Sequence, residues 1–222
     1  MRTAHVTSFD DLPTAVAELG LPSPRPVLAL IGGAGRMAET DLSELFSATI
    51  AATVRQAGAL AVDGGTDSGV MRLMGRARDD FPLVGVAVEA LVEPAGDVPL
   101  EPHHTHRVLV PGSSWGEDAR YLARVATLLS AGAPAVTVLV NGGEIAYDDC
   151  FLSIAEKRPV VVLSGTGRVA DEIAAAASGQ ASDRASGRDS RAVELAHSPW
   201  VRVEQATDRR AVAACLLGHL TG

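Results

Sequence analysis

Short apolar runs alternate with amphipathic helical patterns along most of this chain. The apolar runs are continuous, which is typical of strands that are buried on both faces of a parallel sheet. We interpret as strands the runs 27–31, 60–63, 83–88, 107–110, 135–140, 159–163 and 201–204. This alternation predicts an α/β fold, a three-layer sandwich with a mainly parallel sheet of about seven strands.

Apolar residues at helical spacing fill the segments between these runs. The residues of one such face are Leu42, Leu45, Phe46, Ile50 and Val54. They predict a helix, with Thr40 or Asp41 as its N-cap. Further helices are predicted around 122–129, 151–155, 169–176 and 212–220, and residues 1–22 are expected to add a short strand and a helix around 12–19.

Two segments do not fit this alternation. Residues 89–104 are rich in proline and acidic residues and predict a long irregular loop. Residues 178–191 are polar, carry mixed charge and lack large apolar side chains, so we expect a mobile loop there. We therefore predict one domain over 1–222, with a core over about 27–177 and a last strand and helix over 199–221.

Composition narrows the classes of partner. The net charge of −8 and the aromatic content of 4% argue against binding to a nucleic-acid backbone or to stacked bases. Two cysteines are too few for a disulfide framework or a zinc ribbon. The apolar runs are too short to span a bilayer, and the first residues lack the apolar region of a signal peptide. We expect a cytoplasmic protein with no membrane or nucleic-acid partner.

Glycine clusters follow five of the predicted strands. They are Gly32-Gly33-Ala34-Gly35, Gly64–Gly69, Pro111-Gly112-Ser113-Ser114, Asn141-Gly142-Gly143-Glu144 and Ser164–Arg168. If the strands are parallel, all five clusters lie at one edge of the sheet, where open α/β sheets bind ligands. Glycine lets backbone N–H groups approach a phosphate, and the following helix adds its positive end. A single glycine in a strand-to-helix turn has a purely structural explanation, but five clusters at one edge favour a phosphate site.

The cluster Gly64–Gly69 carries the most specific signal, because Thr66 and Ser68 add hydroxyl groups to it. It is neither a P-loop, since no Gly-Lys-Ser/Thr follows, nor a G-x-G-x-x-G motif. A phosphate site without a P-loop lysine or a metal cluster indicates binding rather than phosphoryl transfer.

The run VDGGTDSGVMRLMGRA (62–77) resembles the strand–Gly-Gly-Thr–helix motif of the SLOG superfamily. The resemblance is to the branch found in the N-terminal region of TRPM (melastatin-type) channels and its prokaryotic relatives. Three further motifs follow in order: THRVLVPG (105–112), VTVLVNGGE (136–144) and PVVVLSGTGRVADEIA (159–174). Together they cover about residues 27–177.

This resemblance implies a Rossmann-like fold that binds ADP-ribose or a related NAD-derived nucleotide. By position, Gly65, Thr66, Ser68 and Gly69 would hold phosphate, while 141–144 and 165–168 would line the ribose and a second phosphate. The expected ligand-binding residues are Gly32, Gly33, Gly65, Thr66, Asp67, Ser68, Gly69, His106, Asn141, Gly142, Gly143, Glu144, Gly165, Thr166, Gly167 and Arg168.

Other SLOG members are LOG phosphoribohydrolases, which carry the motif P-G-G-x-G-T-x-x-E. Laid on residues 141–149, the motif loses its Pro, Gly and Thr to Asn141, Ile145 and Ala146, and we assign its catalytic Glu to Asp148. The partner arginine of the enzymes has no clear counterpart. Both departures count against hydrolysis. Asp148 would be catalytic only if it faced the cleft, and a solvated helix start is the alternative.

Several side chains allow two interpretations. Glu144 could accept hydrogen bonds from ribose or stabilise a helix dipole. Arg168 could bind phosphate or pair with Asp171 or Glu172 on its own helix. Trp115 could stack on adenine or cover the end of the sheet.

The histidines of the run 103–106 could form a metal site, but no second ligand cluster accompanies them, so we predict no metal. His106 matches the Thr/Ser-His that opens this strand in TRPM relatives, and we expect it near the ligand cleft. His103 and His104 are expected in a surface loop.

Three functions remain open: a non-catalytic sensor of an ADP-ribose-type nucleotide, an N-glycosidic hydrolase of a nucleoside monophosphate or NAD-related compound, and an assembly module. The altered hydrolase motif and the five glycine clusters favour the sensor. We expect it to need no cofactor and to form a homodimer.

Overall fold

Eight short strands form one sheet in which every neighbouring pair is parallel. The computed structural model describes residues 1–33, 39–179 and 189–222. The strands, in chain order, are β1 (Arg2–His5), β2 (Val27–Gly32), β3 (Leu60–Asp63), β4 (Leu83–Val88), β5 (His106–Val110), β6 (Ala135–Val140), β7 (Val160–Ser164) and β8 (Val201–Gln205). Their order in the sheet is β1-β5-β4-β3-β2-β6-β7-β8. The predicted α/β sandwich is confirmed, with eight strands and no antiparallel pair among them.

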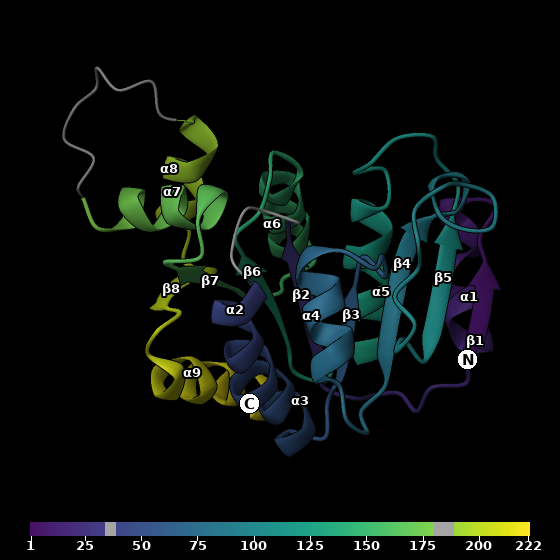
Figure 1. The fold of residues 1–222 in the computed structure, drawn as a ribbon, viewed down its shortest axis with the longest axis horizontal. Helices are drawn as coiled ribbons and strands as arrows, with labels where there is room; N and C mark the ends of the chain where they lie inside the picture. Colours follow the sequence, from purple (N-terminus) through teal and green to yellow (C-terminus); the bar gives the residue numbers. More distant parts are fainter. Residues whose placement is uncertain (34–38, 180–188) are drawn as a thin grey trace.

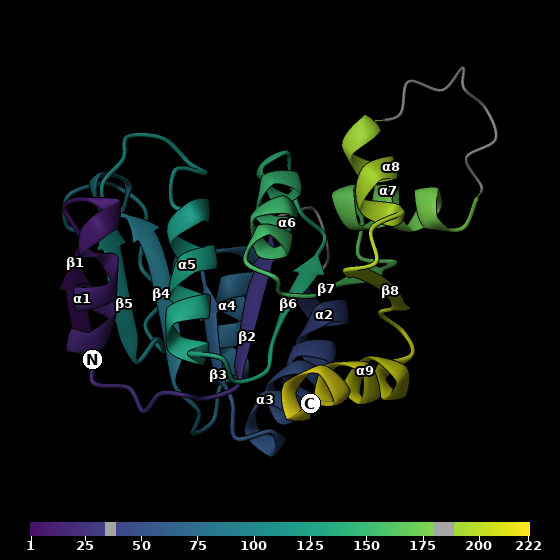
Figure 2. The ribbon, with the colours of Figure 1, turned by 180° about the vertical axis from the view of Figure 1, so that it is seen from behind.

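Helices cover both faces of the sheet (Figures 1 and 2). One face carries α1 (Leu12–Glu18), α5 (Ala119–Ser130), α6 (Ile145–Ala155), α7 (Arg168–Ala177) and α8 (Ser190–Ala196). The other face carries α2 (Glu39–Leu45), the π-helical turn η2 (Phe46–Ala51), α3 (Ala52–Gln56), α4 (Gly69–Ala77) and α9 (Arg209–Thr221). Two 3₁₀ turns, η1 (Phe9–Asp11) and η3 (Glu89–Leu91), complete the elements of the described residues.

The continuous apolar runs are explained by burial on both faces. In β2, Val27, Ala29 and Ile31 pack into one core cluster. Leu28 and Leu30 pack into the cluster on the opposite face. Successive strand side chains point to opposite faces, so a strand between two helical layers needs apolar residues at every position.

Two predictions about local structure change. The single helix predicted over 42–54 is a continuous helical segment with a π-helical turn in its middle, and the side chains of Thr40 and Asp41 lie outside the described residues. Most of the loop predicted over 178–191 also lies outside them. The end of that segment begins α8, a helix that the sequence analysis missed.

In the described part of the chain, no helix has the length and apolarity needed to cross a lipid bilayer.

The order in which the strands are added to the sheet switches direction between β2 and β6. β2 pairs with β3 on one side and with β6 on the other, in register from Val27–Ala135 to Gly32–Val140. Strands β3, β4 and β5 then extend the sheet one way, and β7 and β8 extend it the other way. Helices leave the carboxyl ends of β2 and β6 toward opposite faces, which opens a crevice between them.

Candidate functional site

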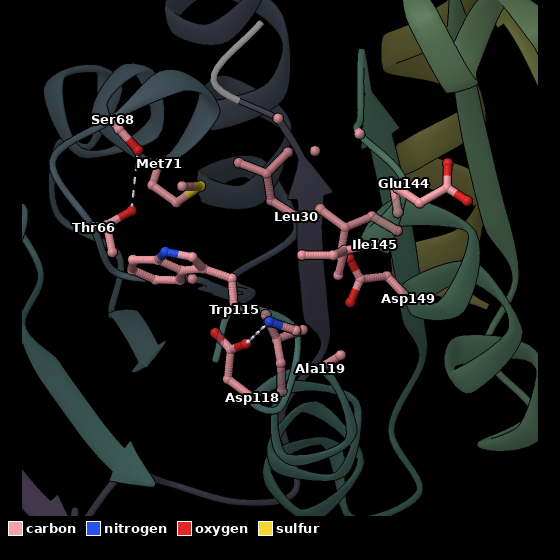
Figure 3. A pocket seen from close by; sticks show the side chains of 18 of the residues that line it. Leu30, Thr66, Ser68, Met71, Trp115, Asp118, Ala119, Glu144, Ile145 and Asp149 are labelled. Carbon is pink, nitrogen blue, oxygen red and sulfur yellow. Dashed lines mark hydrogen bonds between the residues drawn. The ribbon is translucent and has the colours of Figure 1, made fainter. Parts of the chain in front are cut away.

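A pocket of about 490 Å³ lies at this crevice, at the carboxyl edge of the sheet (Figure 3). Its walls combine glycine backbone, apolar side chains and a few polar groups. The lining residues are Leu30, Ile31, Gly32, Gly33, Gly64, Thr66, Ser68, Met71, Val98, Trp115, Gly116, Asp118, Ala119, Leu122, Gly143, Glu144, Ile145, Ala146, Asp149 and Arg168. Apolar walls with a small number of placed polar groups are typical of small-molecule sites.

The prediction that the five glycine clusters share one edge is confirmed, because the strands before them are all parallel. Ala34 and Gly35 of the first cluster lie outside the described residues. Residues from four turns, those after β2, β3, β5 and β6, line the pocket, and Arg168 reaches it from the turn after β7. Val98 adds the connection between β4 and β5, so the pocket is assembled from six connections that are distant in sequence.

The loop after β3 presents hydroxyl groups rather than N–H groups to the pocket. Thr66 and Ser68 both line it, and their hydroxyl oxygens lie 3.2 Å apart. The backbone N–H groups of Asp67 and Ser68 are already used, by the carbonyls of Pro99 and Thr66. The side chain of Asp67 pairs with Arg72 at 2.7 Å. The helix α4 begins next to this loop, at Gly69, and of its first turn Met71 lines the pocket.

Gly65 does not face the pocket, contrary to its assignment as a phosphate ligand. Its N–H donates to Oδ1 of Asp63 at 2.8 Å, and its carbonyl accepts from the N–H of Glu101 at 2.9 Å. Its φ of +67° favours glycine, and a Cβ there would lie 2.9 Å from the Cα of Gly85. Gly65 is needed because two backbones approach each other closely there.

A buried ionic network lies on the interior side of the loop that follows β3. Nε2 of His104 lies 2.7 Å from Oδ1 of Asp63, and Nδ1 of His104 lies 2.8 Å from Oε2 of Glu101. These three side chains are at most 1% exposed. His103 adds a second contact to Glu101, at 2.5 Å. The interpretation of His104 as a surface-loop residue is therefore wrong, because two carboxylates draw it into the interior.

The network shifts the pKa values of His104 and Glu101. Burial alone would lower the pKa of His104, but the adjacent Asp63 and Glu101 carboxylates raise it to about 9. Burial alone would raise the pKa of Glu101, but hydrogen bonds from His104 and His103 lower it to about 2. His104 is thus an imidazolium between two carboxylates at neutral pH.

Arg168 is held in an unusual conformation at the pocket. It is the first residue of α7 and has a φ of +51°, which is rare for a side-chain-bearing residue. Its guanidinium reaches back over the turns that follow β2 and β6. A Cβ on Gly143 would lie 3.1 Å from Nη2 of Arg168, and one on Gly33 would lie 3.5 Å from Nη1.

The carboxylates that could neutralise Arg168 on its own helix are engaged elsewhere. Asp171 accepts the N–H groups of Gly165 and Gly167, at 2.6 and 3.1 Å. Glu172 accepts a hydrogen bond from the hydroxyl of Tyr147. Among the described side chains, those of 1–33, 42–179 and 189–222, none forms a hydrogen bond or ion pair with the Arg168 guanidinium.

The other residues of the clusters after β6 and β7 brace the site from outside the pocket. Asn141 donates from its backbone to Oγ1 of Thr166 at 2.8 Å, and from its amide to the carbonyl of Thr166 at 2.7 Å. Thr166 in turn donates to the carbonyl of Leu163. Gly142, Gly165 and Gly167 all adopt positive φ and do not line the pocket. These bonds tie the two turns together.

Glu144 lies at the pocket rim and is exposed. Its carboxylate forms an ion pair with Arg191 of α8 and points away from the pocket in Figure 3. The same guanidinium pairs with Asp189 and lies 4.3 Å above the ring of Tyr147. Glu144 therefore links α6 to α8, a role that neither sequence interpretation included.

The acidic residues of α6 exchange the roles that the sequence analysis gave them. Asp148 is exposed, whereas Asp149 lines the pocket. Counting from Asn141, the ninth position of the hydrolase motif is also Asp149, so the assignment to Asp148 is wrong by one residue. Burial and the nearby Asp118 and Asp148 carboxylates raise the pKa of Asp149 to about 7.

Asp118 comes from the turn before α5 and was missed. Its carboxylate lines the pocket and accepts the N–H of Gly116 at 3.2 Å. Burial raises its pKa. In sequence it looks like an ordinary helix-capping aspartate, so the only signal was its position after a glycine cluster at the ligand edge. Val98, from the segment predicted as an irregular loop, offered no sequence signal.

His106 lies at the wrong edge of the sheet for its expected place near the cleft. It is the first residue of β5 and pairs in register with Arg2 and Val84, near the starts of β1 and β4. Its Nδ1 lies 2.7 Å from Oγ1 of Thr105. The pocket lies at the carboxyl ends of the strands, so His106 is a full strand length from it.

Trp115 is 49% exposed and lies across the pocket opening between Thr66 and Asp118 (Figure 3). Its ring covers the edge of the sheet and at the same time offers a free face to the pocket. The structure is thus compatible with both sequence interpretations of this residue.

Comparisons with known proteins agree with this architecture. Residues 25–204 match the family described as SLOG in TRPM, prokaryote. Transient receptor potential cation channel subfamily M member 2 of Rattus norvegicus is 25% identical over 202 residues, which cover 70% of this chain and 13% of the channel. A subfamily M member-like 2 protein of Nematostella vectensis is 23% identical over 223 residues, which cover 78% of this chain and 14% of that protein.

The chain spans about one seventh of the length of these relatives. The family match includes β2 to β7, the glycine clusters and every residue that lines the pocket. The chain therefore belongs to the prokaryotic branch of the SLOG domains found in TRPM channels.

Proposed function

We propose that this chain binds a nucleotide-derived ligand in the pocket between β2 and β6, and that the ligand is ADP-ribose or a related NAD-derived nucleotide. It acts as a non-catalytic sensor and needs no cofactor to bind. The observation that carries the proposal is the Arg168 guanidinium, which lies beside Gly33 and Gly143 and pairs with none of the side chains that the structure describes. A guanidinium in such a place matches a phosphate, which it binds through two hydrogen bonds.

The strained backbone of Arg168 supports the same function. A left-handed conformation costs a residue with a side chain about 1–2 kcal/mol. Such strain is concentrated at functional sites, where the surrounding structure holds it in place. Met71 of α4 and Ile145 and Ala146 of α6 line the same pocket, close to the N-termini of their helices, and a helix N-terminus favours an anion.

The test is a thermal-shift and calorimetric screen with ADP-ribose, cyclic ADP-ribose, NAD and AMP. A ligand that binds the folded state raises the melting temperature by mass action. Arg168→Gln is expected to remove the shift, while Arg210→Gln, at an exposed position on α9, should leave it unchanged. An unchanged affinity in folded Arg168→Gln would contradict the proposal.

A second candidate is N-glycosidic hydrolysis of a nucleoside monophosphate or an NAD-related compound. The observation that favours it is Asp149, a carboxyl inside the pocket whose pKa lies near 7. A group with that pKa can act as an acid or a base at neutral pH. Chromatography of AMP, NAD and ADP-ribose incubated with the protein separates the two functions. Release of free base that stops in Asp149→Asn would establish the enzyme, and intact ligands support the sensor.

A further inference from the structure

The two ends of the pocket differ in charge. Arg168 and the glycine turns after β2 and β6 form one end. Asp118 and Asp149 point inward from the start of α5 and from α6, and they form the other end (Figure 3). The proposed phosphate site accounts for Arg168 but not for the two carboxyl groups that line the same pocket.

Asp149 lacks a partner of its own. Its carboxyl group forms no hydrogen bond or ion pair within the described parts of the chain. Asp118 accepts a hydrogen bond from the N–H of Gly116. Asp149 is half-buried in the pocket wall, and a carboxyl group placed there without a partner from the described chain points to a ligand that satisfies it.

The charged groups around this pair do not neutralise it. Asp148 on the same helix and Asp118 across the pocket add negative charge near Asp149, and Glu117 adds to that near Asp118. Arg168 lines the same pocket from α7. Beneath Asp149, Cys150 is fully buried and its pKa is raised, so the thiol stays neutral. The carboxyl end of the pocket is therefore a place for hydrogen-bond donors.

We propose that Asp118 and Asp149 form the sugar-binding end of the pocket, where they accept hydrogen bonds from vicinal hydroxyl groups of a ribose whose phosphate lies at the Arg168 end. This inference rests on the proposed function and specifies which part of the ligand meets which wall. Two carboxyl groups match a diol because each hydroxyl group can donate one hydrogen bond to one carboxylate oxygen. Trp115, Leu122 and Ile145 supply apolar surface around them for the sugar and base.

This arrangement links binding to protons. Near pH 7, free Asp149 is partly protonated, because burial and Asp118 disfavour its charge. Hydroxyl groups that donate to the carboxylate favour the ionised form, so the bound complex releases a proton. A ligand that accepted a hydrogen bond from neutral Asp149 would do the opposite and take up a proton.

Calorimetric titration of the full chain with three probes tests the inference. The probes are ribose 5-phosphate, 2-deoxyribose 5-phosphate and inorganic phosphate. Loss of a hydrogen bond to a charged group weakens binding by about 10- to 100-fold, so the deoxy sugar should bind that much more weakly than ribose 5-phosphate. Asp149→Asn should remove this preference and leave inorganic phosphate binding unchanged. The matched control is Asp148→Asn, the exposed neighbour on the same helix.

Proton release is measured by repeating the ribose 5-phosphate titration at pH 7 in two buffers of different ionisation enthalpy. Phosphate monoesters themselves titrate near this pH, so the quantity compared is the difference between the parent and Asp149→Asn. The parent should release more protons than this variant. Asp148→Asn removes one of the charges that raise the pKa of Asp149, so its proton release should lie between the two.

The outcomes separate this inference from the proposed function. Equal binding of both sugar phosphates, or a ribose preference retained in Asp149→Asn, would overturn the sugar assignment alone. Loss of all three probes in a folded Asp149→Asn variant would also overturn it, because the pair would then hold the phosphate end. Phosphate binding that survives Arg168→Gln contradicts the phosphate assignment. If the parent binds none of the probes or ADP-ribose, both proposals are wrong.

Discussion

Nε2 of His104 lies 2.7 Å from Oδ1 of Asp63, and both side chains are fully buried beneath the loop that carries Thr66 and Ser68. The same Oδ1 atom accepts the N–H of Gly65. Oδ2 of Asp63 is buried and has no hydrogen-bond partner in the part of the chain that the structure describes. The His104–Asp63 pair therefore supports the loop of Thr66 and Ser68 from the protein interior, and the protonation state of His104 contributes to the stability of the fold.

This ion pair predicts how stability depends on pH. The pKa of His104 is raised from 6.5 to about 9 on folding, so its contribution is complete below about pH 6.5 and is lost as the pH rises through 9. The contribution is on the order of 3 kcal/mol. Glu101, with a pKa lowered from 4.5 to about 2, contributes above pH 4.5 and loses its contribution as the pH falls through 2. Melting temperatures measured from pH 2 to pH 10 should therefore fall at both extremes.

The alkaline fall should depend on His104. In His104→Gln the melting temperature should be lower at pH 6 and should change less between pH 6.5 and 9. His197→Gln, at an exposed histidine at the end of α8, should follow the parent curve. An identical alkaline fall in His104→Gln and the parent would show that other groups cause it.

Two helical glycines should respond in opposite directions to alanine. In an unhindered helix, Gly→Ala stabilises by about 0.5–1 kcal/mol. We expect this gain for Gly218→Ala in α9, where a Cβ meets nothing within 4 Å. At Gly75 in α4, a Cβ would lie 2.1 Å from Cδ of Glu101. Gly75→Ala should therefore lower the free energy of unfolding measured by urea titration, and a gain there would mean that the buried carboxylate can move aside at little cost.

Replacing Arg168 with glycine should separate stability from binding. Glycine relieves the strain of a φ of +51°. Arg168→Gly should therefore leave the free energy of unfolding unchanged or raise it by up to about 1 kcal/mol. The melting temperature should change in the same direction. The same variant should lose ADP-ribose binding. Ala131, with a φ of 45° at the end of α5, provides the control: Ala131→Gly should gain similar stability and keep its ligand. A destabilised Arg168→Gly would instead mean that the guanidinium packs structurally.

Trp115 should report directly on the ligand. The chain has two tryptophans, and a Trp200→Phe variant leaves Trp115 as the sole emitter. Because the Trp115 ring has a free face at the pocket, a bound adenine should stack on it and change its emission. Trp115→Ala should weaken binding by about 1–3 kcal/mol, the range of base–aromatic stacking. Unchanged emission at saturating ADP-ribose, together with an unchanged affinity of Trp115→Ala, would place the base elsewhere.

Sequence predicted which segments reach the site better than it predicted which atoms face it. Gly32, Gly33, Thr66, Ser68, Gly143, Glu144 and Arg168 line the pocket as well as belonging to the predicted site. Gly65, Asn141 and Thr166 come from the same turns but point into the protein and brace it. A motif identifies a turn, whereas the direction of each N–H and side chain depends on what packs behind that turn.

The sequence alone determined the parallel α/β sheet and the common edge of the glycine turns. Continuous apolar runs and helical periodicity can be recognised within a short stretch of sequence. Strands that are apolar at every position fit a parallel sheet buried on both faces, and few other structures accommodate them. Only the tertiary structure decided that His104 is buried, that Asp149 rather than Asp148 enters the pocket, that Asp118 joins it, and that Arg168 reaches it from α7. These features depend on residues far away in sequence: a carboxylate 41 residues distant for His104, and a facing helix for Asp149. Burial and electrostatic pairing are set by such distant neighbours, and no local pattern in the chain encodes them.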